Sequence, residues 1–225
     1  MKAVILGKAS SVRVKFKNYR PFYGDLSLTD ILLEKLIKVL DREDIYLSCE
    51  DISFKDVADR WGINFINRDV KYTLLSTDTV EVVRNVCKDV PGDDDILYCS
   101  GMDPLFDDYE DLFSLWEEAR ASHDSLNVVY PMKKYFLDQN YHPIGFEFGH
   151  WHKYSQYMPA TYQISWANLI LKRETIDSVG YMVGINPFWF FANNPTVDID
   201  TQEDWELARV IYKYYRERKH SSGVN

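Results

Sequence analysis

Short apolar runs alternate with longer periodic stretches along the first 130 residues of the chain. Short runs bounded by turn residues predict β-strands at residues 3–6, 44–48, 63–67, 96–99 and 125–130, with residues 96–99 as the central strand. Apolar residues at helical spacing predict helices at residues 26–40, 54–61, 80–87 and 108–121, and a last helix that ends near Arg218. Strands that alternate with helices predict an α/β fold, in which helices cover both faces of a mainly parallel sheet in three αβα layers.

The periodic pattern disappears between Lys133 and Tyr162, where Tyr, His, Phe, Gly and Pro are frequent. An unstructured span of that length is unusual inside a compact domain. We therefore expect a single domain over residues 1–225, with a hairpin excursion or dimerisation arm at about residues 133–162. Its density of aromatic residues suits a subunit interface, which predicts a homodimer. His150 and His152 lack a third ligand type close in the sequence, so we interpret them as ordinary strand residues.

The composition excludes several classes of partner. The net charge of −9 argues against nucleic acid or an anionic membrane as a partner. No apolar run is long enough to span a bilayer and no signal peptide precedes the first strand, so a cytoplasmic protein is expected. The three cysteines lack the spacing of a metal site, which predicts buried free thiols in a reducing compartment.

Positive charge is concentrated just after the first predicted strand. A loop of small residues follows that strand and carries Lys8, Arg13, Lys15 and Lys17. A strand, a small and basic loop, and then a helix is how α/β proteins present N–H groups and cations to phosphate. The spacing matches neither the Walker pattern nor GxGxxG, so a lysine-rich surface loop is the alternative.

A pair of acidic residues near the other end of the chain predicts a metal site. In an extended strand Asp198 and Asp200 share one face, whereas Val197 and Ile199 point into the core. Two carboxylates beside a triphosphate are suitable ligands for Mg²⁺. Alternatively, Asp200 or Thr201 caps the last helix, as the spacing Thr201-x-x-Asp204 would allow.

Other polar residues lie between predicted strands and helices. Ser76 and Asp78 precede a predicted helix, and Asp103 follows the central strand. Asp103 could orient Mg²⁺ or a ribose hydroxyl, because ligands of parallel sheets bind at the carboxyl ends of strands. Each of the three residues could instead cap the helix that follows it.

Two motifs resemble the acylneuraminate cytidylyltransferase family, whose members make CMP-activated sugar acids. The first is Ser11-x-Arg13-Val14-x-x-Lys17-Asn18-x-Arg20-Pro21, followed by Gly24. The second is Asp198-Ile199-Asp200-Thr201-Gln202-Glu203-Asp204, which resembles the family's Asp-Ile-Asp-Thr-Pro-Glu-Asp. The chain departs from the first motif by having Gly7-Lys8 in place of Ala-Arg, Val12 in place of Lys, and Lys15 in place of Pro.

This resemblance implies a fold similar to the nucleotide-diphospho-sugar transferases, which is Rossmann-like. It implies a Mg²⁺-dependent transfer of CMP from CTP to a small acidic acceptor, with release of pyrophosphate. The implied catalytic residues are Lys8, Arg13 and Lys17, and the implied Mg²⁺ ligands are Asp198 and Asp200. The nucleotide-binding candidates are Gly7, Ala9, Ser10, Ser11, Asn18, Ser76, Asp78 and Asp103.

The segment Gln156-x-x-Pro159-x-x-Tyr162 also resembles the family and implies an acceptor site. Its candidate residues are Gln156, Tyr162, Ser165 and Trp166. Ser165 and Trp166 replace the family's Asn-Gly, so we expect a reshaped pocket and an acceptor other than sialic acid. Two other functions stay open, a glycosyltransferase that uses a sugar nucleotide and a non-catalytic nucleotide-binding or assembly protein. The acceptor itself is not named by the sequence.

Overall fold

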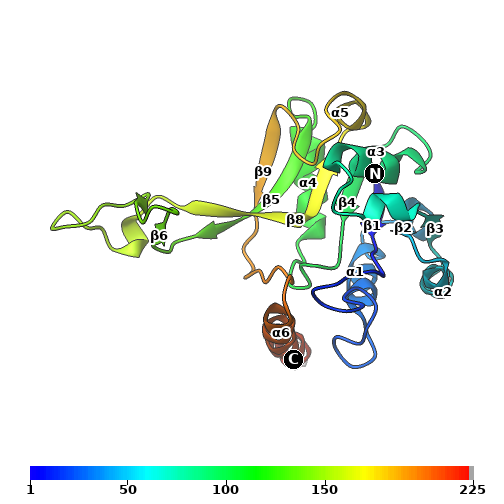
Figure 1. Ribbon diagram of the computed structural model, residues 1–225, viewed down its shortest axis with the longest axis horizontal. Helices are drawn as coiled ribbons and strands as arrows, with labels where there is room; N and C mark the ends of the chain where they lie inside the picture. Colours follow the sequence, from blue (N-terminus) through cyan, green and yellow to red (C-terminus); the bar gives the residue numbers. More distant parts are fainter. Residues whose placement is uncertain (223–225) are drawn as a thin grey trace.

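The computed structural model describes residues 1–222 and is built on a seven-stranded sheet (Figure 1). The strand order is β3-β2-β1-β4-β8-β5-β9. The strands are β1 (Lys2–Leu6), β2 (Ile45–Cys49), β3 (Asn64–Asn67), β4 (Ile96–Cys99), β5 (Ser125–Met132), β8 (Thr161–Leu171) and β9 (Pro187–Phe191). Strand β8 runs antiparallel to its neighbours β4 and β5, and the other pairs are parallel. The expected mainly parallel sheet with β4 at its centre is confirmed.

Helices cover both faces of this sheet. Helices α1 (Leu28–Leu36), α2 (Lys55–Trp61) and α4 (Tyr109–Ala119) contribute to one core cluster, with Leu97 and Cys99 of β4. Helices α3 (Thr79–Lys88) and α5 (Arg173–Ser178) contribute to another, with Ile96 and Tyr98. Alternate residues of β4 therefore face opposite layers, as a strand covered on both faces requires. The predicted three-layer αβα fold is confirmed.

Strand β8 was not predicted, and its pairing with β5 is interrupted by a bulge. Asn127 of β5 faces Leu169, but Val129 faces Ile164, so residues 165–168 lie opposite one residue of β5, although Asn168 still pairs with Cys99 of β4. Bulges are frequent beside functional sites, where they change the direction of side chains. This bulge breaks the alternation that identifies a strand from its sequence.

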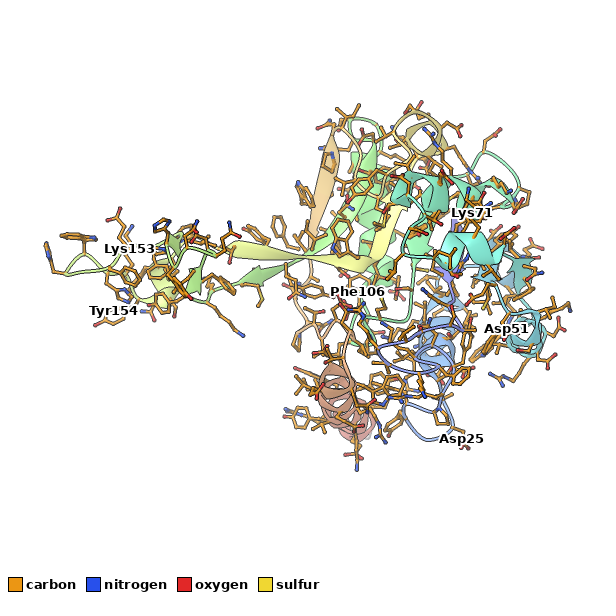
Figure 2. The ribbon with its side chains drawn as sticks, in the orientation of Figure 1. Asp25, Asp51, Lys71, Phe106, Lys153 and Tyr154 are labelled. Atoms are coloured by element: carbon orange, nitrogen blue, oxygen red, sulfur yellow. The ribbon has the colours of Figure 1, made fainter. Side chains whose placement is uncertain are left out.

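The segment between β5 and β8 projects from the body of the molecule (Figure 1). We call residues 133–160 the arm. It contains the short strands β6 (Phe136–Leu137) and β7 (Pro143–Ile144) and the short 3₁₀ helix η4 (Ser155–Tyr157). The ring of Tyr135 stacks on His152, with ring centroids 5.0 Å apart, and its hydroxyl donates a hydrogen bond to the carbonyl of Lys153 (2.9 Å). In Figure 2 the labelled residues Lys153 and Tyr154 lie on the arm, away from the body of the molecule.

Two further sequence expectations concern the cysteines and the membrane. Cys49, Cys87 and Cys99 are buried and free, as expected. No helix within residues 1–222 combines the length and apolar character needed to cross a membrane.

The carboxylate of Asp30 joins helices α1 and α2. It accepts hydrogen bonds from the amide and hydroxyl of Ser27 (2.9 and 2.6 Å), which caps α1, and from Arg60 and Trp61 of α2 (2.6 and 2.8 Å). Burial acts to raise the pKa of Asp30, but the hydrogen bonds from Ser27 and Trp61 outweigh it, so the pKa lies below the ordinary 3.8. The ionised form is therefore the one that stabilises the fold.

We expect Asp30→Asn to lower the free energy of unfolding by about 2–3 kcal/mol, because several charge-assisted hydrogen bonds are lost together. The depressed pKa means that this contribution is complete above pH 3.8 and disappears as the pH falls through the native pKa. Urea denaturation at several pH values measures both effects. The control is Asp25→Asn, which removes the same charge from an exposed loop position (Figure 2). An equal loss of stability in both variants would contradict the role of Asp30.

Candidate nucleotide and metal site

The two ends of the chain meet through the last helix, α6 (Gln202–Ser222). Trp205 of α6 packs edge to face on Phe22 of the N-terminal loop, with ring centroids 5.0 Å apart. The guanidinium of Arg20 lies 3.8 Å from the centre of the Trp205 ring and donates a hydrogen bond to Gln202 (2.9 Å). Helix α6 therefore packs against the N-terminal loop and brings residues 198–200 to the basic residues there.

Asp200 is the meeting point of this arrangement. Its Oδ1 lies 2.8 Å from a guanidinium nitrogen of Arg13 and 4.0 Å from Nζ of Lys17. Lys17 also donates a hydrogen bond to the carbonyl of Ile199. Two of the predicted cations thus lie beside the predicted metal ligands, although more than 180 residues separate them in sequence.

Lys17 is buried, whereas Lys15 is exposed. Burial lowers the pKa of Lys17, and the nearby Asp200 and Asp198 act in the opposite direction. A lysine whose stem is buried has few orientations available to it, so its ammonium is held at the acidic segment. The structure therefore distinguishes two lysines that the sequence places in the same loop.

Asp198 is half-buried, and its Oδ1 has no hydrogen-bond partner among the residues described. Burial raises the pKa of Asp198, and the neighbouring Asp200 raises it further. A buried carboxylate oxygen without a donor favours a cation, so this pair fits a Mg²⁺ ion that takes its other ligands from phosphate and water. Within residues 1–222 no group of three or more His, Cys, Asp or Glu forms a protein-only metal site.

The expected strand around Asp198 is not formed. Strand β9 ends at Phe191, and residues 192–200 form no strand. Pro195 lacks the N–H that a ladder needs, which is consistent with the chain leaving the sheet there. Capping of α6 is performed by Thr201 and Asp204, whose side chains accept hydrogen bonds from each other's backbone N–H (3.1 and 2.8 Å). The carboxylate of Asp200 is therefore left to the two cations.

Asp103 lies under this segment. It is buried, and its Oδ2 accepts hydrogen bonds from the hydroxyls of Tyr130 (2.5 Å) and Ser165 (3.4 Å). Burial raises the pKa of Asp103. The next residue before it, Met102, accepts a hydrogen bond at its carbonyl from the amide of Ile199 (3.2 Å). Asp103 thus connects the loop after β4 with Ser165 in the bulge of β8, rather than capping helix α4.

The other nucleotide-binding candidates have structural partners. Asp78 caps α3 by accepting a hydrogen bond from the amide of Val80 (2.7 Å), and Ser76 is exposed in the preceding loop. Lys8 donates a hydrogen bond to the carbonyl of Thr73 (2.6 Å), in the loop that also carries Ser76. The hydroxyl of Ser11 and the side-chain amide of Asn18 both donate hydrogen bonds to the carbonyl of Lys8 (3.3 and 3.5 Å). A Cβ at Gly7 would overlap the hydroxyl of Tyr19, so a larger residue there would displace that side chain.

The N–H groups of Ala9 and Ser10 donate to a carboxylate that the sequence did not single out. Both donate hydrogen bonds to Oε1 of Glu50, and each bond is 3.0 Å long. Glu50 follows β2, and its sequence position at a strand's carboxyl end was the one available signal.

The acceptor candidates are spread over a wider area. Ser165 reaches Asp103, but the ring of Trp166 lies against Tyr181, with centroids 6.4 Å apart. Tyr162 packs on Phe191, and Gln156 is exposed in the arm. Among the four, Ser165 is the one that the structure brings to Asp103.

Comparison with known proteins decides the family. A family model described as Cytidylyltransferase matches residues 3–178. The chain belongs to the cytidylyltransferase family. It is therefore a nucleotidyltransferase of the cytidylyltransferase type, as the N-terminal motif predicted. No curated protein matches the sequence of this cytidylyltransferase.

Solved structures share the fold of this cytidylyltransferase at low sequence identity. A CMP:2-keto-3-deoxy-manno-octonic acid synthetase in complex with CTP has 12% identity and a TM-score of 0.66, over 95% of this chain and 98% of its own. A putative glucose-1-phosphate thymidylyltransferase from Bacillus anthracis has 14% identity and a TM-score of 0.64, over 94% of both chains. A 4-diphosphocytidyl-2C-methyl-D-erythritol synthase from Anaerococcus prevotii has 14% identity and a TM-score of 0.61, over 94% of this chain and 95% of its own. The expected nucleotide-diphospho-sugar transferase-like fold is confirmed.

We expect Lys17→Met to lower kcat/KM for CTP about 10²-fold, since it removes the ammonium at Asp200 while it keeps an apolar stem of similar length. Lys15→Met, the matched control in the same loop, should change kcat/KM less than about twofold, because Lys15 is exposed. Steady-state kinetics with varied CTP measures both. A larger loss for Lys15→Met than for Lys17→Met would show that the loop has been assigned in the wrong register.

Proposed function

We propose that this cytidylyltransferase transfers CMP from CTP to a small acidic acceptor, such as a sugar acid, with Mg²⁺ as cofactor. The observation that carries the proposal is the contact of Arg13 and Lys17 with Asp200, beside the unpartnered oxygen of Asp198. Cations and carboxylates in contact are what a metal–triphosphate complex needs around it. The fold neighbour that is a CMP-sugar acid synthetase in complex with CTP supports the choice of nucleotide.

In the proposed reaction an oxygen of the acceptor attacks the α-phosphorus of CTP. A new oxygen–phosphorus bond forms, the bond from the α-phosphorus to the bridging oxygen breaks, pyrophosphate leaves, and an acceptor that attacks through a hydroxyl releases its proton to solvent. Arg13 and Lys17 would neutralise the charge that develops on pyrophosphate. Asp198 and Asp200 would hold Mg²⁺, which polarises phosphoryl oxygens when it is bound.

The acceptor would lie beside Asp103 and Ser165. Support comes from the hydrogen bond between these two residues, from the bulge that turns Ser165 to this side, and from the closeness of Asp103 to the Asp198 segment. Serine at this position cannot reproduce the paired donor and acceptor of the Asn amide that the family carries there. A lost polar contact can change selectivity by orders of magnitude, which supports an acceptor other than N-acetylneuraminic acid.

The proposed function predicts pyrophosphate release from CTP that depends on Mg²⁺ and on a sugar acid. Asp198→Ala and Asp200→Ala should each lower that rate about 10²-fold or more, because the charge that holds the metal is lost. The control is Glu203→Ala, an exposed carboxylate in the first turn of α6. Circular dichroism establishes that each variant is folded. Unchanged turnover in both aspartate variants would refute the metal assignment, and no release with any sugar acid or related acid would refute the acceptor class.

We also propose that the arm pairs two copies of the chain and that the reaction takes place in the cytoplasm. Tyr141, Trp151 and Tyr154 are more than half exposed on the arm. Aromatic side chains gathered on a projecting segment are typical of an interface core. The three free thiols support a reducing compartment.

The arm proposal predicts a dimer by light scattering. The double variant Trp151→Asp/Tyr154→Asp should be a monomer, because it places charge in the apolar interface. Ile185→Asp is the control, since Ile185 is an even more exposed apolar residue but lies outside the arm. A monomeric wild-type protein, or a double variant that stays dimeric, would contradict the arm's role.

A further inference from the structure

The loop that follows β1 folds, at its first residues, around a carboxylate of the chain itself. Oε1 of Glu50 accepts hydrogen bonds from the amides of Ala9 and Ser10 (3.0 Å each) and from the hydroxyl of Ser10 (2.9 Å). Two successive backbone N–H groups and a hydroxyl that converge on one oxygen form an anion-binding nest. In this protein a carboxylate of the chain itself, that of Glu50, fills the nest.

The side chain of Glu50 is buried, and its second oxygen pairs with Arg68. Its side chain is 7% exposed, and Oε2 lies 3.5 Å from a guanidinium nitrogen of Arg68, which is 3% exposed. The same guanidinium donates to the carbonyls of Gly7 (2.5 Å) and Ser48 (3.4 Å). Burial opposes ionisation of Glu50, but hydrogen bonds from Ser10 and the charge of Arg68 keep its pKa below the ordinary value. The nest therefore holds a charged carboxylate that is bonded on both sides.

We propose that Glu50 is a positioning residue, which fixes the start of the loop so that CTP phosphates bind further along it, at Arg13 and Lys17. The amides of Ala9 and Ser10 then serve as structural donors and not as phosphate ligands. This inference rests on the proposed use of CTP, and it changes the role that the sequence motif implied for Ala9 and Ser10.

The loop is anchored at two places, which explains how Glu50 affects the binding of phosphates that it does not touch. At its start, Glu50 and Arg68 hold residues 7–10. At its end, Lys17 is buried and bonded to Ile199. Arg13 lies between the anchors and is largely exposed, with a side chain 69% accessible. Loss of the first anchor would leave Arg13 on a longer flexible segment, so its alignment with phosphate would cost more conformational entropy.

The test uses Glu50→Ala and Glu50→Gln in the full chain, with Asp56→Ala as control. Asp56 is an exposed carboxylate of α2, so its replacement makes the same change of charge without removing a bond to the loop. Amide exchange at Ala9 and Ser10 is measured by NMR without nucleotide, and binding of CTP with Mg²⁺ and of pyrophosphate is measured by calorimetry. Glutamine retains an acceptor oxygen for the two amides, so it separates hydrogen bonding from charge.

In Glu50→Ala we expect exchange at Ala9 and Ser10 to be at least about tenfold faster and CTP to bind about tenfold more weakly. Glu50→Gln should recover most of the protection, and Asp56→Ala should behave as the wild type. Tighter binding of CTP or pyrophosphate by Glu50→Ala would overturn the proposal, because Glu50 would then be a competitor for a phosphate site. Unchanged exchange in Glu50→Ala would also overturn it. Should the wild type bind no CTP, the proposed function fails, but the exchange data still decide whether Glu50 orders the loop.

Discussion

The contact between helix α6 and the N-terminal loop is the constraint on which the candidate site depends. Trp205 packs on Phe22, and Arg20 stacks on the same indole, so the last helix is held against the loop after β1. The segment just before that helix carries Asp198 and Asp200, which therefore reach Arg13 and Lys17. Closing so long a loop of chain costs entropy, and burial of these aromatic rings offsets that cost. A change in this contact would displace Asp198 and Asp200 without replacing either residue.

One of the two carboxylates of the site lies beside cations of the chain, whereas the other has an oxygen without a partner. Asp200 is neutralised by Arg13, with Lys17 close by, whereas Asp198 has a buried oxygen with no partner among the described residues. An unpaired buried carboxylate costs stability, and such groups are concentrated at functional sites. The same pattern recurs in Asp103, whose Oδ1 has no partner in residues 1–222.

The sequence predicted the first half of the fold because each strand there is short, apolar and bounded by turn residues. It did not predict β8, because a bulge interrupts the alternation of that strand. It did not predict β9 either, because Phe191 at the end of β9 is aromatic but exposed, so apolar character does not mark the buried face there. Among the site residues, Lys17, Arg13 and Asp200 could be predicted from two motifs, and their contact needed the structure. The strand expected at Asp198 was wrong because the chain leaves the sheet after Phe191. Glu50 escaped prediction because nothing in its neighbours shows that two backbone amides converge on it.

Calorimetric titration of the wild type with CTP, ATP and UDP-sugars, each with and without Mg²⁺, tests the central claim most directly. That claim is that the two ends of the chain form one site for a metal–triphosphate complex. It predicts that CTP binds most tightly and that Mg²⁺ strengthens its binding, because the carboxylates of Asp198 and Asp200 repel bare triphosphate. Preferential binding of a UDP-sugar, or CTP binding that is indifferent to Mg²⁺, would contradict it.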